Sequence, residues 1–269
     1  MLAADHRWQW EGWCDARGVP RTRIPGAKRL ALDGLLLARQ QSAAACRHAA
    51  FLIDQQYGEA EIARARRAGV AVGTPVERAG AFPLEWAVDP FWTAAPGDFA
   101  KVLVRHQTEW PDAIHHAQLD KLRALGDWCR ANRRVFLVEV LVMTTDAERP
   151  AVLAHVIRDA YARGVVPDYW KVEGTTSADA MAAVESAVAE DPNARIVILG
   201  KAASLDTIAA WFRASASAPR AVGFAIGRSV YWEPAAEHLS GSIDETAAVQ
   251  RIADNYLRVI DAWTARVHE

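Results

Sequence analysis

The chain has 269 residues, of which 51% are hydrophobic and 24% charged, with a formal net charge of −2. This composition is typical of a globular protein with a large core, and it gives no reason to expect nucleic acid or an anionic membrane as a partner. Three scattered cysteines, no apolar run of membrane-spanning length and no signal-peptide pattern favour a reduced, cytoplasmic protein.

Short apolar runs of strand length recur along the chain. They cover residues 1–4, 50–54, 70–77, 101–106, 135–142, 169–174, 195–200 and 221–227. Several are nearly continuous stretches of Val, Ile and Leu, a pattern typical of parallel strands that are covered on both faces. These runs predict eight strands in chain order.

Helical patterns separate most of these runs. They cover residues 27–48, 58–68, 112–131, 150–161, 177–190, 204–214 and 243–265. Pro150 fits the first turn of its helix, and serines that open three of the segments are candidate N-caps, namely Ser177, Ser204 and Ser242. The segment 78–99, which follows the third strand, is predicted to be irregular or only weakly helical.

The alternation of strands and helices predicts the fold. Eight βα units in a chain of this length predict an α/β protein with a single (β/α)₈ TIM barrel over residues 1–269. The rival is an open doubly wound sheet, which the lack of a G-x-G-x-x-G motif after an early strand disfavours. In a barrel, polar residues at the C-terminal ends of strands lie at the active-site face.

Charged side chains of both signs follow the predicted strands. Any one of them could instead be a helix cap or an exposed loop residue. In strand order the set is Asp5, His6 and Arg7; Asp54, Gln55 and Gln56; Glu77 and Arg78; Arg105 and His106; Glu139; Lys171 and Glu173; Gly200 and Lys201; Gly227 and Arg228.

Glu139 and Lys171 differ from the others because each lies inside an apolar strand. A charge buried there needs a partner or must shift its pKa, so we expect the two to share the barrel mouth. The chain uses only five lysines against twenty-six arginines. A lysine amine can attack a carbonyl, which arginine cannot do, and this favours a nucleophilic role for Lys171. The alternative is that Lys171 only forms an ion pair with Glu139 or Asp5.

The eighth strand is followed by a glycine and an arginine, in the stretch VGFAIGRSVYW. Loops after the last two strands of a barrel often bind phosphate through backbone N–H groups at a helix N-terminus. Gly227, Arg228 and Gly200 are therefore candidates for binding a phosphate group, which Arg228 could hold with its planar fork.

Seven segments in order carry a family resemblance over nearly the whole chain. They are LAADHR, LIDQQYG, PVERAG, KVLVRH, FLVEVLV, PDYWKVEG and VGFAIGRSVYW. Together they resemble the aldolase-like domain of unknown function that is often fused behind the sugar kinase of inositol catabolism (5-dehydro-2-deoxygluconokinase). More distantly, they are similar to class I tagatose-bisphosphate and sulfofructose-phosphate aldolases. Kinase motifs are absent, so we expect the aldolase part alone.

The resemblance implies roles for individual residues. Lys171 corresponds to the Schiff-base nucleophile, Glu139 to a proton shuttle assisted by Asp5, and Gly227 with Arg228 to a phosphate clamp. Two positions depart from the relatives. His6 stands where the tagatose-type enzymes have a glutamine, as it does in the inositol-type domain. Arg78 stands where the inositol-type domain has a lysine.

A metal-independent, cofactor-free lyase is the expected activity. The expected substrate is a phosphorylated keto-sugar or keto-sugar acid, with 2-deoxy-5-keto-D-gluconate 6-phosphate as the first choice and dihydroxyacetone phosphate and malonate semialdehyde as its products. Tagatose 1,6-bisphosphate, sulfofructose 1-phosphate and a non-catalytic sugar-phosphate-binding barrel are the alternatives. The other candidate substrate contacts are His6, Arg7, Gln55, Arg78, Arg105 and Glu173.

Two further alternatives concern metal and assembly. His6 with Asp5, Asp54 and Glu77 could hold a divalent cation, but no pair of histidines at strand ends has ligand spacing. The apolar stretch 81–92 could cover one end of the barrel or form the interface of a homo-oligomer.

Overall fold

Eight parallel strands form the centre of the molecule in a computed structural model that describes residues 1–267. Each strand pairs with the next along the chain, and a parallel bridge between Leu2 and Ile226 joins the last strand to the first. The predicted (β/α)₈ barrel is therefore confirmed. The strands are β1 (Leu2–Ala4), β2 (Ala50–Ile53), β3 (Ala71–Pro75), β4 (Phe99–Gln107), β5 (Val135–Met143), β6 (Tyr169–Glu173), β7 (Arg195–Leu199) and β8 (Ala221–Ala225).

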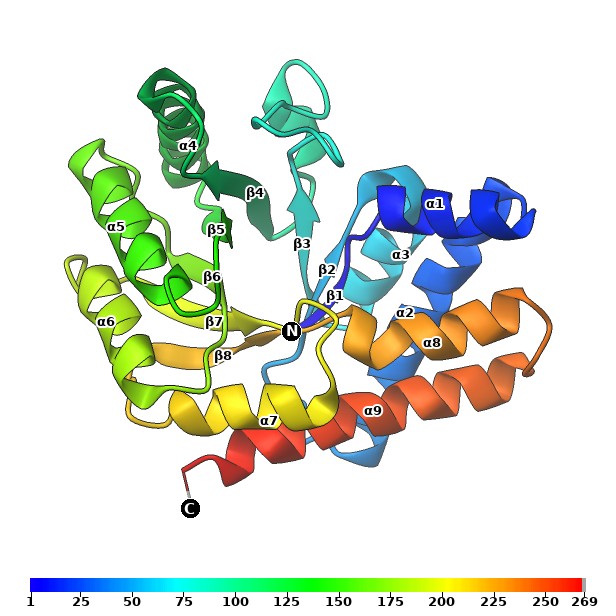
Figure 1. Ribbon diagram of the computed structural model, residues 1–269. Helices are drawn as coiled ribbons and strands as arrows, with labels where there is room; N and C mark the ends of the chain where they lie inside the picture. The colour runs from blue at the N-terminus through cyan, green and yellow to red at the C-terminus, as the bar shows by residue number, and fades with distance from the viewer. Residues whose placement is uncertain (268–269) are drawn as a thin grey trace.

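Helices surround the strands as an outer ring (Figure 1). They are α1 (Trp8–Arg17), α2 (Ile24–Gln41), α3 (Gln55–Arg67), α4 (Asp112–Ala131), α5 (Arg149–Ala162), α6 (Ala178–Val188), α7 (Leu205–Ala214), α8 (Arg228–Leu239) and α9 (Glu245–Ala265), with short 3₁₀ turns η1 (Arg21–Arg23) and η2 (Phe91–Ala94). The sequence patterns did not predict α1 and α8. The first is rich in tryptophan and the second contains Pro234, so neither has a clear apolar stripe.

The helix ends test the predicted caps. Ser177 and Ser204 each accept a hydrogen bond from a backbone N–H of the following turn, as predicted. The prediction for Ser242 was wrong, because Asp244 caps α9 instead and accepts from the Ala247 N–H at 2.7 Å. A carboxylate at this position also interacts favourably with the helix dipole.

The segment between β3 and β4 contains only the turn η2 and occupies the part of the ring between α3 and α4 (Figure 1). Leu84 anchors it: its N–H donates to Gln118 Oε1 at 3.0 Å, and its side chain is buried. Phe91 packs between Trp86 and Trp128. The segment 81–92 therefore covers the side of the barrel next to α4.

The barrel interior is layered. Apolar side chains form one layer, namely Ala3, Leu52, Phe99, Leu137, Val197 and Ala225. Side chains alternate along a strand, so the next inward positions lie two residues further on. On three strands these positions carry the charged residues Lys101, Glu139 and Lys171, and strand pairing places Glu139 directly beside Lys171. The charged side chains therefore form the layer next to the apolar one, on the side of the C-terminal strand ends.

Candidate active site

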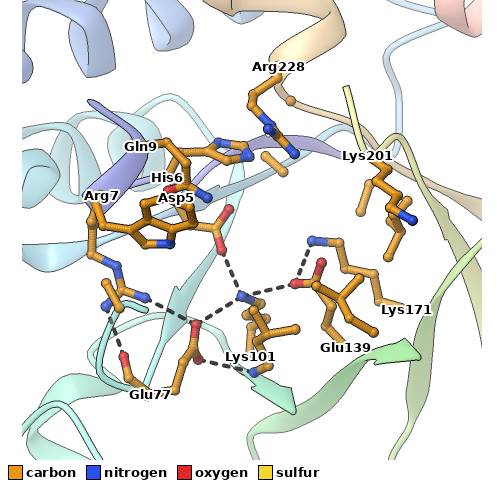
Figure 2. A pocket seen from close by; sticks show the side chains of 18 of the residues that line it. Asp5, His6, Arg7, Gln9, Glu77, Lys101, Glu139, Lys171, Lys201 and Arg228 are labelled. Carbon is orange, nitrogen blue, oxygen red and sulfur yellow. Dashed lines mark hydrogen bonds and ion pairs between the residues drawn. The ribbon is translucent and has the colours of Figure 1, made fainter. Parts of the chain in front are cut away.

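A cavity opens at the C-terminal mouth of the barrel. Figure 2 shows charged side chains from β4, β5 and β6, and from the segments that follow β1 and β3, converging in it. It brings together nine of the residues predicted from the sequence: Asp5, His6, Arg7, Arg78, Glu139, Lys171, Gly200, Gly227 and Arg228. Glu77 and Lys201, which the sequence placed at strand ends without a substrate role, also line it, and Gln9, Phe82 and Lys101 line it without having been predicted.

Lys101 lies at the centre of the buried charges. Its Nζ is 2.9 Å from Asp5 Oδ2, 3.0 Å from Glu77 Oε1 and 2.9 Å from Glu139 Oε2, and the residue is only 2% exposed. Burial alone would lower the pKa of Lys101, but the three carboxylates outweigh it and raise that pKa well above its ordinary value. Lys101 is therefore held as an ammonium ion.

Lys171 approaches the same cluster from β6. Its Nζ lies 2.9 Å from Glu139 Oε2, the oxygen that also contacts Lys101. Burial tends to raise the pKa of Glu139, but Lys101 and then Lys171 reverse this effect and lower it. The same two lysines hold the pKa of Asp5 well below its usual range despite its burial. Two carboxylates thus stay ionised between two lysines.

Arg7 and Glu77 brace one side of the cluster. Arg7 Nη1 donates to the Glu77 backbone carbonyl at 2.9 Å, and its Nη2 lies 3.1 Å from Glu77 Oε1. The other carboxylate oxygen of Glu77 accepts from the Leu103 N–H at 3.3 Å. Arg7 is buried, so much of its hydrogen-bonding capacity serves this bracing. Arg78 lies at the rim, where it pairs with Glu85.

Lys28 of α2 fixes the chain on both sides of Asp5. It is fully buried and donates to the backbone carbonyls of Ala4 and His6. Its Nζ also lies 2.6 Å from Asp54 Oδ2, at the end of β2. Asp54 caps α3 as well, accepting from the Tyr57 N–H. A buried ion pair thus determines where β1 presents Asp5.

The ends of β7 and β8 meet at the opposite edge of the cavity. Gly227 precedes α8, and a Cβ atom there would lie 1.8 Å from the Ala3 carbonyl oxygen, so this close approach requires glycine. A tight turn begins at Gly200, whose carbonyl accepts from the Ala203 N–H at 2.7 Å. Lys201 in that turn has a left-handed φ of 45°. Helix N-termini and such turns direct N–H groups towards anions.

Three residues predicted for the site do not line this cavity. Gln55 begins α3 and is exposed, because β2 ends before Asp54. Arg105 lies where only β4 and β5 remain paired, beyond the mouth, and stacks over Phe82 at 3.7 Å. Glu173 pairs with Arg149 of α5 at 3.2 Å and with Lys201 at 2.9 Å.

The sequence also offered a histidine and three acids as ligands for a divalent cation. Within residues 1–267, no group of three His, Cys, Asp or Glu side chains is arranged to hold a metal ion. Asp54, one of the acids considered, is occupied by Lys28. No helix in the described part of the chain combines the length and apolarity needed to cross a membrane.

The fold places the protein among (β/α)₈ barrels. It matches a fructose-bisphosphate aldolase from Plasmodium falciparum, solved in complex with TRAP and a small-molecule inhibitor, with a TM-score of 0.71 and 14% sequence identity over 99% of this chain and 89% of that chain. Residues 1–267 match the model of a family described as uncharacterized proteins conserved in bacteria (DUF2090), and the chain belongs to that family. No curated protein matches the sequence.

Proposed function

We propose that the protein is a class I aldolase in which Lys171 forms a Schiff base with a phosphorylated keto-sugar or keto-sugar acid. The observation that carries the proposal is that two buried lysines contact the same glutamate but differ in the number of their carboxylate partners. Lys101 has three carboxylate partners, whereas Glu139 is the only carboxylate that contacts Lys171 among the described residues. The two lysines are therefore suited to different roles.

Lys171 is the better nucleophile of the pair. Lys101 keeps its proton because three carboxylates stabilise it. Within residues 1–267, Lys171 has Glu139 as its one carboxylate partner, at 2.9 Å, so it is the amine that we assign to attack on a carbonyl, with Glu139 as the proton acceptor.

The proposed reaction uses these groups in the following order. Lys171 adds to the substrate ketone, and loss of water gives an iminium ion that withdraws electrons. A base removes the proton from the hydroxyl group two carbons away from the iminium carbon. The C–C bond between them then breaks, an aldehyde is released, and the electron pair of the bond converts the iminium ion into an enamine. Protonation of the enamine and addition of water release the ketone product and restore the lysine. Glu139 and Asp5 transfer the protons, and charged Lys101 stabilises the anionic oxygens.

The edge formed by β7 and β8 supplies a phosphate site in this proposal. Arg228, the N–H groups at the start of α8 and the turn after Gly200 face the cavity from that edge. Arg7 and Arg78 line it from β1 and β3 and are the candidates for a second anion, whereas Arg105 lies outside. A substrate with two anionic groups fits this distribution, and we favour 2-deoxy-5-keto-D-gluconate 6-phosphate.

Other substrates are compatible with the same cluster. Tagatose 1,6-bisphosphate and sulfofructose 1-phosphate also carry an anion at each end of a keto-sugar. The solved relative is a fructose-bisphosphate aldolase, which favours a bisphosphate to a similar degree. Cleavage rates of these three compounds and of fructose 1,6-bisphosphate, measured side by side, identify the substrate.

Reductive trapping tests the mechanism. The protein is incubated with each substrate and borohydride, digested, and mapped by mass spectrometry. We expect a reduced adduct on Lys171 in the wild type and none in Lys171→Arg, with Lys201→Arg as the matched control that still forms it. An adduct on Lys101 or Lys201 would contradict the assignment of the nucleophile. Binding of the substrates without any adduct would favour a non-catalytic barrel, and cleavage abolished by EDTA would contradict a metal-free mechanism.

A further inference from the structure

A buried chain of hydrogen bonds leads from α1 through α8 to His6. Trp10 Nε1 donates to the hydroxyl oxygen of Tyr231 at 3.0 Å, and that oxygen lies 3.3 Å from His6 Nδ1. Trp10 and Tyr231 are completely buried. Trp232 stacks on Trp10 with 3.9 Å between the ring centroids, which fixes the position of the indole.

The direction of these bonds follows from the chemistry of the groups. An indole N–H can only donate, so the Tyr231 oxygen must accept from Trp10. A buried hydroxyl group also needs an acceptor for its own proton. Among residues 1–267, His6 Nδ1 is the only atom in contact with this hydroxyl that can accept it. Burial also raises the pKa of Tyr231 well above its ordinary value, so the hydroxyl keeps its proton.

The acceptor role leaves His6 Nδ1 without a proton. The imidazole must then carry its proton on Nε2, as a neutral ring. Burial lowers the pKa of His6 to about 3, and positive charge on Arg228, Lys28 and Lys171 acts in the same direction, against the opposing effect of Asp5. The titratable side chain in direct contact with the imidazole is Tyr231, whose hydroxyl keeps its proton.

We propose that Trp10 and Tyr231 act as positioning residues that fix His6 as the neutral Nε2–H form, which then donates a hydrogen bond to an anionic substrate oxygen beside Arg228. The tautomer depends only on the hydrogen-bond chain, whereas the contact with substrate rests on the proposed function.

The surroundings of His6 favour an anion as the acceptor. Figure 2 shows the imidazole beside the Arg228 guanidinium at the cavity wall. Both residues line the cavity, and Arg228 Nε is buried without a hydrogen-bond partner. Two donor groups side by side at the cavity wall are suited to an oxygen with several lone pairs, such as a phosphoryl oxygen. A neutral imidazole supplies a donor whose strength does not change with pH across the neutral range.

Nitrogen-15 NMR of the full-length protein tests the tautomer directly. His6 is assigned by comparison with His6→Gln, and its two ring nitrogens are followed from pH 8 to pH 5.5. We expect an unprotonated Nδ1 and a protonated Nε2 throughout. Tyr231→Phe and, independently, Trp10→Phe should shift the His6 signals towards a mixture of tautomers, while circular dichroism reports whether each variant is folded. A protonated Nδ1, or a charged ring at pH 6, in the wild type overturns the proposal even if no variant folds.

The contact with an anion is tested with inorganic sulfate, which keeps two negative charges over this pH range. We expect sulfate to shift the His6 Nε2–H signal in the wild type but not in Arg228→Gln. No shift at saturating sulfate would overturn the donor role and leave the Schiff-base proposal untouched.

If the enzyme cleaves a sugar phosphate, His6→Met should raise KM about tenfold or more, the effect of losing one hydrogen bond to a charged group, and His6→Gln should restore most of the loss. Equal KM values for the two variants would contradict the proposal.

Discussion

The two sides of the barrel mouth differ in how their polar groups are partnered. On one side, Asp5, Glu77, Lys101, Glu139 and Lys171 form an ion-pair cluster in which every charged group contacts another. On the other side, Gly200, Gly227 and Arg228 form a donor rim, in which the Arg228 Nε is buried without a partner. Under the proposed function, the paired groups keep their protonation and position, whereas the unpaired donor of Arg228 is left to bind the substrate.

The largest difference is expected when the amine of the ion-pair cluster loses its reactivity. Lys171→Arg keeps the positive charge beside Glu139 but cannot form an imine. We expect cleavage to fall by at least about ten-thousandfold with little change in the melting temperature. Lys201→Arg, a matched change in an exposed lysine of the same cavity, should stay within about threefold of the wild type. Residual activity within a hundredfold in Lys171→Arg would contradict the proposed nucleophile.

The second effect concerns stability, because Lys101 links three carboxylates. Lys101→Met leaves Asp5 and Glu77 without this cation and Glu139 with Lys171 alone. Removing one partner of a buried ion pair costs about 3–5 kcal/mol. We expect a loss of this size in urea denaturation at pH 7, and a smaller loss near pH 4, where the unpaired carboxylates can take up protons. Lys201→Met, whose ion pair is half exposed, should lose less than about 1 kcal/mol. Equal losses in the two variants would contradict a central role for Lys101.

Lys101 is a central residue of the site that the sequence patterns did not predict. The strands were predicted to within two residues, because each is a distinct apolar run. The filter of polar residues at strand ends assumed that strands end at the mouth. β4 continues beyond it, so its inward charge, Lys101, lies early in the strand, and Arg105 lies beyond the cavity. The argument that selected Lys171, a rare lysine in an apolar strand, applies equally to Lys101 and would have found it.

The partners of the charged residues were the other part that sequence patterns could not predict. Glu139 beside Lys171 was predicted and is confirmed as a contact. Lys28, by contrast, is one lysine in an amphipathic helix, and its burial against Asp54 depends on how α2 packs on the strand ends. Contacts between residues far apart in the sequence arise from packing, which a local pattern does not specify.

The donor rim predicts a loss of binding without a loss of stability. Arg228→Gln removes the guanidinium from the cavity, and no ion pair within residues 1–267 depends on it. We expect KM for the phosphorylated substrate to rise about 10–100-fold with kcat within about threefold, as for a lost hydrogen bond to a charged group. Arg78→Gln, a change at the exposed rim, is the matched control for general charge loss. A large fall in kcat at unchanged KM would place Arg228 with the reacting groups instead.

His6 should make the free energy of unfolding depend on pH between pH 7 and pH 5, above the range in which carboxylates usually take up protons. Because the pKa of His6 falls from 6.5 to about 3 on folding, the unfolded chain binds more protons below pH 6.5, and stability present at pH 7 is lost as pH falls. Between pH 7 and pH 5 this loss is about 1–2 kcal/mol. Burial lowers the pKa of His106 to about 4, so it contributes in the same window. His6→Gln should flatten the slope of stability against pH, and His106→Gln, outside the cavity, should flatten it separately. An unchanged slope in His6→Gln would contradict a buried neutral imidazole.

The smallest effect is expected at Glu173, which lies just beyond the ion-pair cluster. Its carboxylate contacts Arg149 at 3.2 Å and Lys201 at 2.9 Å, and neither lysine of the cluster. Glu173→Gln keeps the size of the side chain and removes only its charge. If Glu173 braces the outer edge of β6 and takes no part in catalysis, kcat should stay within about threefold and stability should fall by no more than about 1 kcal/mol. A loss of kcat above a hundredfold, with the fold intact, would mean that a carboxylate outside the cavity acts on Lys171. Glu173 would then belong to the catalytic groups together with the ion-pair cluster.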